Sequence, residues 1–144
     1  MTLHAVPESA PTVPAPEGDW QYGLRLHHDD RAPGIARAVA RIVLHERGLI
    51  PLIDSAELVC SELVTNAVRY STGDLFLRLK GDEDKTLRLS VHDTNPHPPT
   101  PATPDQDDTH GRGLLIVRSL AHRWGIYDLT RTSGGKVVWA ELRK

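Results

Sequence analysis

The chain has 144 residues, with 17 Lys and Arg against 19 Asp and Glu, for a formal net charge of −2. This length suits one domain that buries its own core, and the near-neutral charge argues against a protein that coats nucleic acid or an anionic membrane. A single cysteine, Cys60, excludes an internal disulfide framework and a zinc site built from cysteines. The longest aliphatic run is far shorter than the ~20 residues of a membrane span, and no signal peptide is visible, so we expect a cytoplasmic protein.

The N-terminal segment, residues 1–18, is predicted to be a disordered tail. Four prolines fall within it, and its apolar residues have no period that would build a buried face. The folded domain is therefore expected over residues 19–144. It opens with a predicted strand over residues 20–26, where every second residue is apolar: Trp20, Tyr22, Leu24 and Leu26.

Two helices are predicted next. The first covers residues 32–47 and ends before Gly48, and its expected buried face comprises Ile35, Val39, Ile42, Val43 and Glu46. The second covers residues 55–70, where Asp54 and Glu57 have the spacing of a capping box. An unbroken apolar stripe with helical spacing follows: Ala56, Val59, Cys60, Leu63, Val64, Ala67 and Val68.

The second half of the chain predicts mainly strands. Residues 74–80 and 86–93 alternate as a hairpin does, and residues 94–110 form a long connection with five prolines. Such a length favours either a functional lid or a disordered insert. A helix over residues 113–123, with Trp124 on its buried side, and strands over 126–130 and 136–142 complete the chain. The expected fold is an α+β two-layer sandwich whose mixed, mainly antiparallel sheet has helices on one face.

A carboxylate and a carboxamide lie one helical turn apart on the second predicted helix. Glu62 and Asn66 are separated by about 40° around the helix axis, beside the apolar stripe. A Glu in this position can accept a proton, and an Asn oxygen can ligate a hard cation such as Mg²⁺. Pairs of this kind also occur on ordinary solvated helix faces, so the spacing alone leaves both interpretations open.

Asp93 ends a predicted strand on its core-facing side. It has the parity of Leu87, Leu89 and Val91, so its carboxylate must be paired, hydrogen-bonded or functional. As a pure acceptor it suits an exocyclic amine or a backbone N–H. The alternative is an Asp that caps the backbone of Asn95 in a turn before Pro96.

The segment Gly111-Arg112-Gly113-Leu114 joins the long connection to a predicted helix. Glycines let a phosphate approach the backbone, and a helix N-terminus offers free N–H groups to an anion. Arg112 would add positive charge. The alternative interpretation is a flexible hinge.

The order of these features resembles the ATP-binding domain shared by gyrase, Hsp90, histidine kinases and the DNA mismatch-repair ATPases. Ser-Glu-Leu-Val-Thr-Asn-Ala-Val at 61–68 and Gly-Arg-Gly-Leu-Leu-Ile-Val at 111–117 are similar to the small single-domain branch that contains the anti-sigma-factor serine/threonine kinases. Gly-Gly-Lys-Val-Val-Trp at 134–139 is similar to that branch as well. The resemblance covers about residues 20–142.

This resemblance implies a site for ATP and Mg²⁺ between helices and sheet, beneath a lid at about 94–110. Asn66 would ligate Mg²⁺, and Asp93 would accept a hydrogen bond from the adenine amino group. The residues Gly111, Arg112, Gly113 and Leu114 would hold phosphates, chiefly through backbone N–H groups. Glu62 would be the general base that activates a partner's hydroxyl or a water molecule.

The function implied is an ATP-binding regulator that phosphorylates a Ser or Thr of an antagonist protein in a partner-switching pathway. Its partners would be a sigma factor or similar client and an anti-sigma-factor antagonist; a homodimer is inferred from relatives alone. The larger family usually has Asp-x-Gly-x-Gly after its adenine strand, whereas residues 93–97 are Asp-Thr-Asn-Pro-His. The alternative function is therefore a binding module of the same fold without phosphoryl transfer.

Overall fold

The computed structural model describes residues 2–5, 18–93, 115–129 and 134–144. In chain order, its elements are β1 (Thr2–Ala5), β2 (Trp20–Leu26), α1 (Ala32–Glu46), the short 3₁₀ helix η1 (Ile50–Leu52), α2 (Ile53–Tyr70), β3 (Leu75–Gly81), β4 (Thr86–Asp93), β5 (Arg123–Asp128) and β6 (Lys136–Arg143). Residues 115–120 are also helical.

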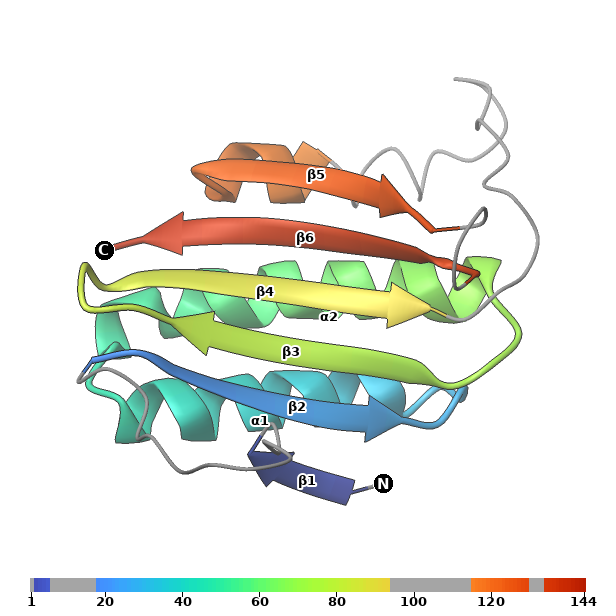
Figure 1. The fold of residues 1–144 in the computed structure, drawn as a ribbon, viewed down its shortest axis with the longest axis horizontal. Helices are drawn as coiled ribbons and strands as arrows, with labels where there is room; N and C mark the ends of the chain where they lie inside the picture. The colour runs from blue at the N-terminus through green and yellow to red at the C-terminus, as the bar shows by residue number, and fades with distance from the viewer. Residues whose placement is uncertain (1, 6–17, 94–114, 130–133) are drawn as a thin grey trace.

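The strands within these ranges form one sheet with the order β1-β2-β3-β4-β6-β5, and every described pairing is antiparallel. Figure 1 shows α1 and α2 together on one side of this sheet. The predicted α+β two-layer sandwich is therefore confirmed. We call the side of the sheet that faces these helices the inner face and the opposite side the outer face.

Strict alternation along the central strands builds the core. In β3, Leu75, Leu77 and Leu79 are fully buried on the inner face, whereas Phe76, Arg78 and Lys80 point outward and are exposed. The apolar stripe predicted on α2 packs against this inner layer, and its Val59, Cys60 and Val64 are fully buried. Burial of leucines at about 25 cal/mol per Å² of apolar surface is the main force that holds helices and sheet together.

The buried face of α1 differs in part from the prediction. Val39 and Val43 are buried as expected, but Ile42 is 57% exposed and Glu46 is exposed. The small residues Ala36 and Ala40 are fully buried instead. Because alanine is small, it allows α1 to approach α2 closely. The buried face of α1 therefore includes alanines that are less hydrophobic than the predicted Ile42.

The start of α2 and the end of the last predicted helix also differ from the prediction. The predicted capping box is wrong: α2 begins at Ile53 in direct continuation of η1, and no side chain caps its N-terminus. Glu57 instead binds Arg41 of α1. The predicted helix over 113–123 ends at residue 120 in its described part, and Trp124 lies on β5.

The predicted tail contains an ordered element. Residues 2–5 form the edge strand β1, which pairs with β2 in an antiparallel register from Thr2 opposite Arg25 to Ala5 opposite Tyr22. Backbone hydrogen bonds to an open sheet edge need no apolar periodicity, so the composition of the segment could not reveal them. Residues 6–17 lie outside the described part of the chain.

Across the described ranges, the structure contains no helix of the length and apolarity that a membrane crossing requires.

Candidate functional site

Glu62 and Asn66 lie in the second half of α2, which packs across β3, β4 and β6. Both side chains are partly buried, beside the buried Leu63 and Val64. Their spacing on a continuous helix keeps them about 6 Å apart along the axis and on the same side. The predicted polar row at the margin of the apolar stripe is therefore present, and its chemical role stays a prediction.

The C-terminal turn that follows Asn66 is held by polar groups from outside the helix. The Ser71 hydroxyl donates to the Ala67 carbonyl oxygen at 2.5 Å, and Nε2 of His28 donates to the Val68 carbonyl oxygen at 2.6 Å. Carbonyl groups in the last turn of a helix lack intrahelical partners, and His28 supplies one to Val68. The Ala67 carbonyl oxygen already accepts the backbone N–H of Ser71 at 3.0 Å, and the hydroxyl adds a second bond. Neither Ser71 nor His28 was predicted from the sequence to have this role.

Two arginines of α1 fix α2 near the same residues. Arg41 forms a bidentate pair with the Glu57 carboxylate at 2.7 and 3.2 Å, and Arg37 donates to the Ser61 hydroxyl at 2.8 Å. Ser61 directly precedes Glu62 in the chain. The rotation of α2 about its axis, and with it the direction of Glu62, is therefore constrained by charge-assisted bonds as well as by packing.

Asp93 ends β4 on the inner face, as its parity predicted, and is only 3% exposed. It lies opposite Leu75 of β3 and Lys136 of β6, and Lys136 lies opposite Asp128 of β5. A buried carboxylate requires hydrogen-bonding or charged partners, because its transfer from water costs several kcal/mol. This end of the inner face therefore combines a buried acid with a cation in the adjoining strand.

The end of β4 and the C-terminal end of α2 lie at the same end of the molecule (Figure 1). Asn66 and Asp93, which are 27 positions apart in the sequence, are thus carried by elements that meet there. The predicted residues Gly111, Arg112, Gly113 and Leu114, and the predicted lid, lie outside the described residues. The helix expected after Gly113 is present over residues 115–120, where Val117 is fully buried.

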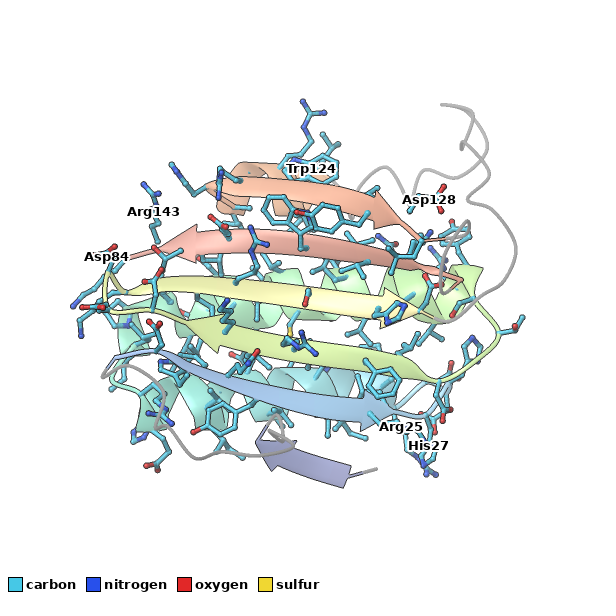
Figure 2. All side chains as sticks on the ribbon, in the orientation of Figure 1. Arg25, His27, Asp84, Trp124, Asp128 and Arg143 are labelled. Atoms are coloured by element: carbon cyan, nitrogen blue, oxygen red, sulfur yellow. The ribbon has the colours of Figure 1, made fainter. Side chains whose placement is uncertain are left out.

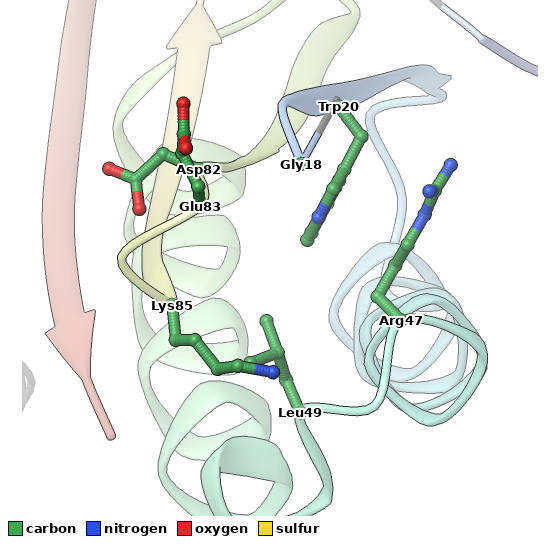
Figure 3. Close-up of a pocket in the computed structure, with 7 residues that line it drawn as sticks. All are labelled: Gly18, Trp20, Arg47, Leu49, Asp82, Glu83 and Lys85. Atoms are coloured by element: carbon green, nitrogen blue, oxygen red, sulfur yellow. The ribbon is translucent and has the colours of Figure 1, made fainter. Parts of the chain in front are cut away.

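A cavity of about 460 Å³ lies at the opposite end of the sheet, beside the turn between β3 and β4. Figure 3 shows the residues that line it: Gly18, Trp20, Arg47, Leu49, Asp82, Glu83 and Lys85. The cavity contains none of the residues predicted for the site. Its mixed charges include no buried acid comparable to Asp93, so the chemistry of the predicted site does not extend to it.

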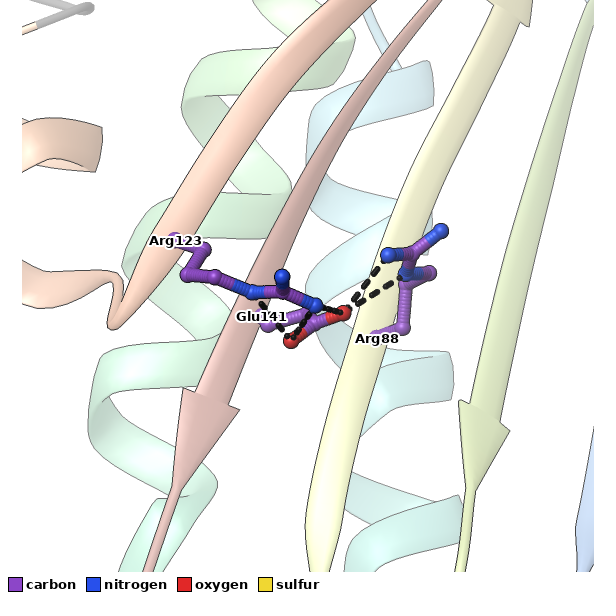
Figure 4. A network of polar contacts seen from close by, with 3 residues as sticks. All are labelled: Arg88, Arg123 and Glu141. Atoms are coloured by element: carbon purple, nitrogen blue, oxygen red, sulfur yellow. Dashed lines mark hydrogen bonds and ion pairs between the residues drawn. The ribbon is translucent and has the colours of Figure 1, made fainter.

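One polar cluster was not predicted from the sequence. Glu141 of β6 is 7% exposed on the outer face, where its carboxylate accepts hydrogen bonds from Arg88 at 2.6 Å and from Arg123 at 2.8 Å (Figure 4). The hydrogen bond from Arg123 is the main cause that lowers the pKa of Glu141, and Arg88 adds to it. A Glu between apolar strand residues was the available signal, but its partners depend on strand order.

The profile of the histidine kinase-like ATPase domain family matches residues 27–142. The matched region contains Glu62, Asn66, Asp93 and the segment 111–114, and it spans α1, α2 and strands β3 to β6. No curated protein shows a significant match to the chain.

Proposed function

Since this chain belongs to the histidine kinase-like ATPase domain family, we propose that it is an ATP-binding regulator of the anti-sigma-factor type that acts as a serine/threonine protein kinase. Its setting in this proposal is the cytoplasm. Membership of the family supports ATP as the ligand. The likeness of segments 61–68 and 111–117 to the small regulatory branch supports the assignment as a kinase of the anti-sigma-factor type.

The observation that carries the proposal is the burial of Asp93 at the end of β4. Asp93 is 3% exposed, so its carboxylate is largely withdrawn from water and suits the recognition of a single polar group. In our proposal it accepts a hydrogen bond from the exocyclic amine of adenine, a group that guanine replaces by a carbonyl oxygen. Guanine would set an oxygen against a carboxylate, which explains a preference for ATP.

The remaining contacts are assigned residue by residue. The Asn66 side-chain oxygen would hold Mg²⁺, which neutralises phosphate charge when it is bound. Backbone N–H groups of Gly111, Gly113 and Leu114 would donate to phosphate oxygens, and Arg112 would add charge. The partly buried Asn66 carboxamide offers an oxygen to the cation, and the buried Asp93 carboxylate offers an acceptor to the adenine amine, so these two residues fit the ligand.

Glu62 is the proposed general base. Its carboxylate would accept the proton of a Ser or Thr hydroxyl on an antagonist protein while that oxygen bonds to the γ-phosphorus of ATP. The bond from this phosphorus to the bridging oxygen breaks, and ADP leaves. The phosphorylated antagonist would then lose its affinity for the chain, which becomes free to bind a sigma factor or similar client.

A second candidate is a binding module of the same fold without phosphoryl transfer. The Asp-Thr-Asn-Pro-His sequence at 93–97 favours it, because both glycines usual after the adenine Asp are absent and Pro96 restricts the backbone. In this case ATP would serve as a structural ligand that stabilises the folded chain.

Calorimetric titration of the purified chain with ATP, ADP and GTP, with and without Mg²⁺, tests the proposal. We expect Mg²⁺-dependent binding that is selective for adenine. Selective binding without phosphorylation of an antagonist would favour the second candidate. No binding of any nucleotide at millimolar concentration would rule out both nucleotide-dependent functions.

A further inference from the structure

The outer face of the sheet carries a concentration of positive charge that the overall composition hides. The chain as a whole has a net charge of −2. In strands β2 to β6, however, the outward-pointing positions include one carboxylate, Glu141, and these cations: Arg25, Arg78, Lys80, Arg88, Arg123 and Arg143. Figure 2 views the molecule from this side, with Arg25 and Arg143 near opposite ends of the strands.

Strand register arranges these side chains in rows across the sheet. One row contains Lys80, Arg88, Glu141 and Arg123, and the next contains Arg78, Ser90 and Trp139. A shallow cavity of about 190 Å³ spans the two rows. Its β3 and β4 side is lined by Arg78, Lys80 and Arg88 together with Ser90. Its β5 and β6 side includes the stacked rings of Tyr127 and Trp139, whose centroids are 6.1 Å apart.

The cluster in Figure 4 shows which of these cations are already engaged. Arg88 and Arg123 hold the Glu141 carboxylate, and the Arg88 guanidinium also lies 4.2 Å from the centroid of the Trp139 ring. Arg78 and Lys80 are exposed, and no ion pair or hydrogen bond within the described ranges engages them. The outer face therefore binds one carboxylate of its own chain, that of Glu141. Arg78 and Lys80 remain available to carboxylates of another molecule.

We propose that this outer face binds an extended acidic segment of a partner protein, laid along β3. Arg78 and Lys80 are two residues apart on one strand, so their Cα atoms are separated by about 6.6–6.8 Å. Alternate residues of an extended peptide have the same separation, so two carboxylates at alternate positions match both cations. Neighbouring side chains of the segment would contact the cavity beside Trp139.

Charge distinguishes this occupant from others. A second copy of the chain would set the same cations against each other, and like charges across an interface are unfavourable. A nucleic acid or a membrane would extend past the face, and the acidic turn Asp82-Glu83-Asp84 at one end would repel a long polyanion. That turn borders the cationic rows, because Asp82 lines a cavity together with Lys80, Arg88 and Glu141. A short acidic segment can end before it.

This surface lies on the opposite side of the sheet from Asp93, α1 and α2. Its occupation does not depend on nucleotide binding, so the inference is independent of the proposed kinase activity. It concerns only how the chain recognises a partner.

A binding assay tests the inference with a fluorescent peptide of alternating Glu and Ser, measured by anisotropy at low salt and neutral pH. The full chain should bind this peptide, and the corresponding peptide of alternating Gln and Ser should not bind. The double variant Arg78→Ala/Lys80→Ala should weaken binding by about tenfold or more. Both side chains are exposed, so the variant should fold, which circular dichroism would check.

The matched control is Arg31→Ala/Arg118→Ala, which removes the same charge from two exposed positions outside the outer face. It should bind the Glu/Ser peptide as the unmodified chain does. Equal losses in the two double variants would show a general charge effect and overturn the inference. It would also be overturned if the peptide does not bind, or if oligothymidine or anionic vesicles compete for Arg78 and Lys80 with higher affinity than the peptide.

Discussion

Asp93 lies opposite Lys136 in the antiparallel register of β4 and β6, and both side chains belong to the inner face. An acid that is 3% exposed thus has a cation at the adjoining position of the next strand. The two residues are far apart in the sequence. Their juxtaposition places a buried acceptor and a positive charge at the end of the sheet where α2 also ends.

The first prediction concerns nucleotide selectivity. Asp93→Asn preserves the size of the side chain but removes its charge. It also replaces one acceptor oxygen by an amide NH2 group, which donates hydrogen bonds. We expect ATP affinity to fall by about tenfold and the preference for ATP over GTP to shrink, because a charged acceptor is replaced by a weaker one. Calorimetric titration of both nucleotides measures this. Asp54→Asn, an equal charge change at an exposed position of α2, should alter neither. Retention of full selectivity in Asp93→Asn would refute the adenine assignment.

The second prediction separates binding from transfer. Glu62→Gln should leave ATP affinity unchanged and abolish phosphorylation of the antagonist, because a carboxamide cannot accept the hydroxyl proton. Asn66→Ala should instead weaken Mg²⁺-dependent ATP binding itself, because it removes the proposed ligand oxygen. Titrations and phosphoryl-transfer assays on both variants test the division. If Glu62→Gln weakened binding as much as Asn66→Ala, Glu62 would be a binding residue and the base assignment would be wrong.

The third prediction concerns acid stability. Glu141 has a lowered pKa because Arg123 and Arg88 bind its ionised form. A group whose pKa is lower in the folded state stabilises the fold above its unfolded pKa, and this contribution is lost as pH falls through the folded value. Glu141→Gln should therefore lower the free energy of unfolding by about 1 kcal/mol at neutral pH, a figure reduced by solvent around the arginines.

Urea denaturation at several pH values measures that difference. The gap between Glu141→Gln and the unmodified chain should begin to narrow below about pH 4, where the carboxylate becomes protonated in the unfolded state, and should close at lower pH, once the folded state is protonated as well. Glu83→Gln, at the exposed β3–β4 turn, is the control and should show no such narrowing. A gap independent of pH would mean that shape, and not charge, makes Glu141 important.

The fourth prediction concerns the only thiol. Cys60 is fully buried in the stripe of α2, and burial raises its pKa to about 12. The thiolate is the reactive form, so the folded chain should resist iodoacetamide at neutral pH and react readily once it is unfolded in urea. Mass spectrometry of the alkylated chain gives the readout. Rapid labelling under native conditions would mean that α2 separates from the sheet.

Local patterns predicted the elements well because each depends on residues close together in the chain. Alternation located β3 and β4, and the apolar stripe located α2. The same parity placed Asp93 on the inner face. Boundaries were less predictable: the capping signal at Asp54 was overridden by η1, which continues directly into α2.

The sequence by itself determined which side chains alternate toward a core and that Glu62 and Asn66 share one side of a helix, since both follow from the local repeat of the backbone. Only the tertiary structure decided that Glu141 binds Arg88 and Arg123, which are 53 and 18 positions away. It also decided that Arg78 and Lys80 share a face with Tyr127 and Trp139. These neighbours depend on strand order and register, which arise from packing the whole sheet against its helices, and no single segment encodes them.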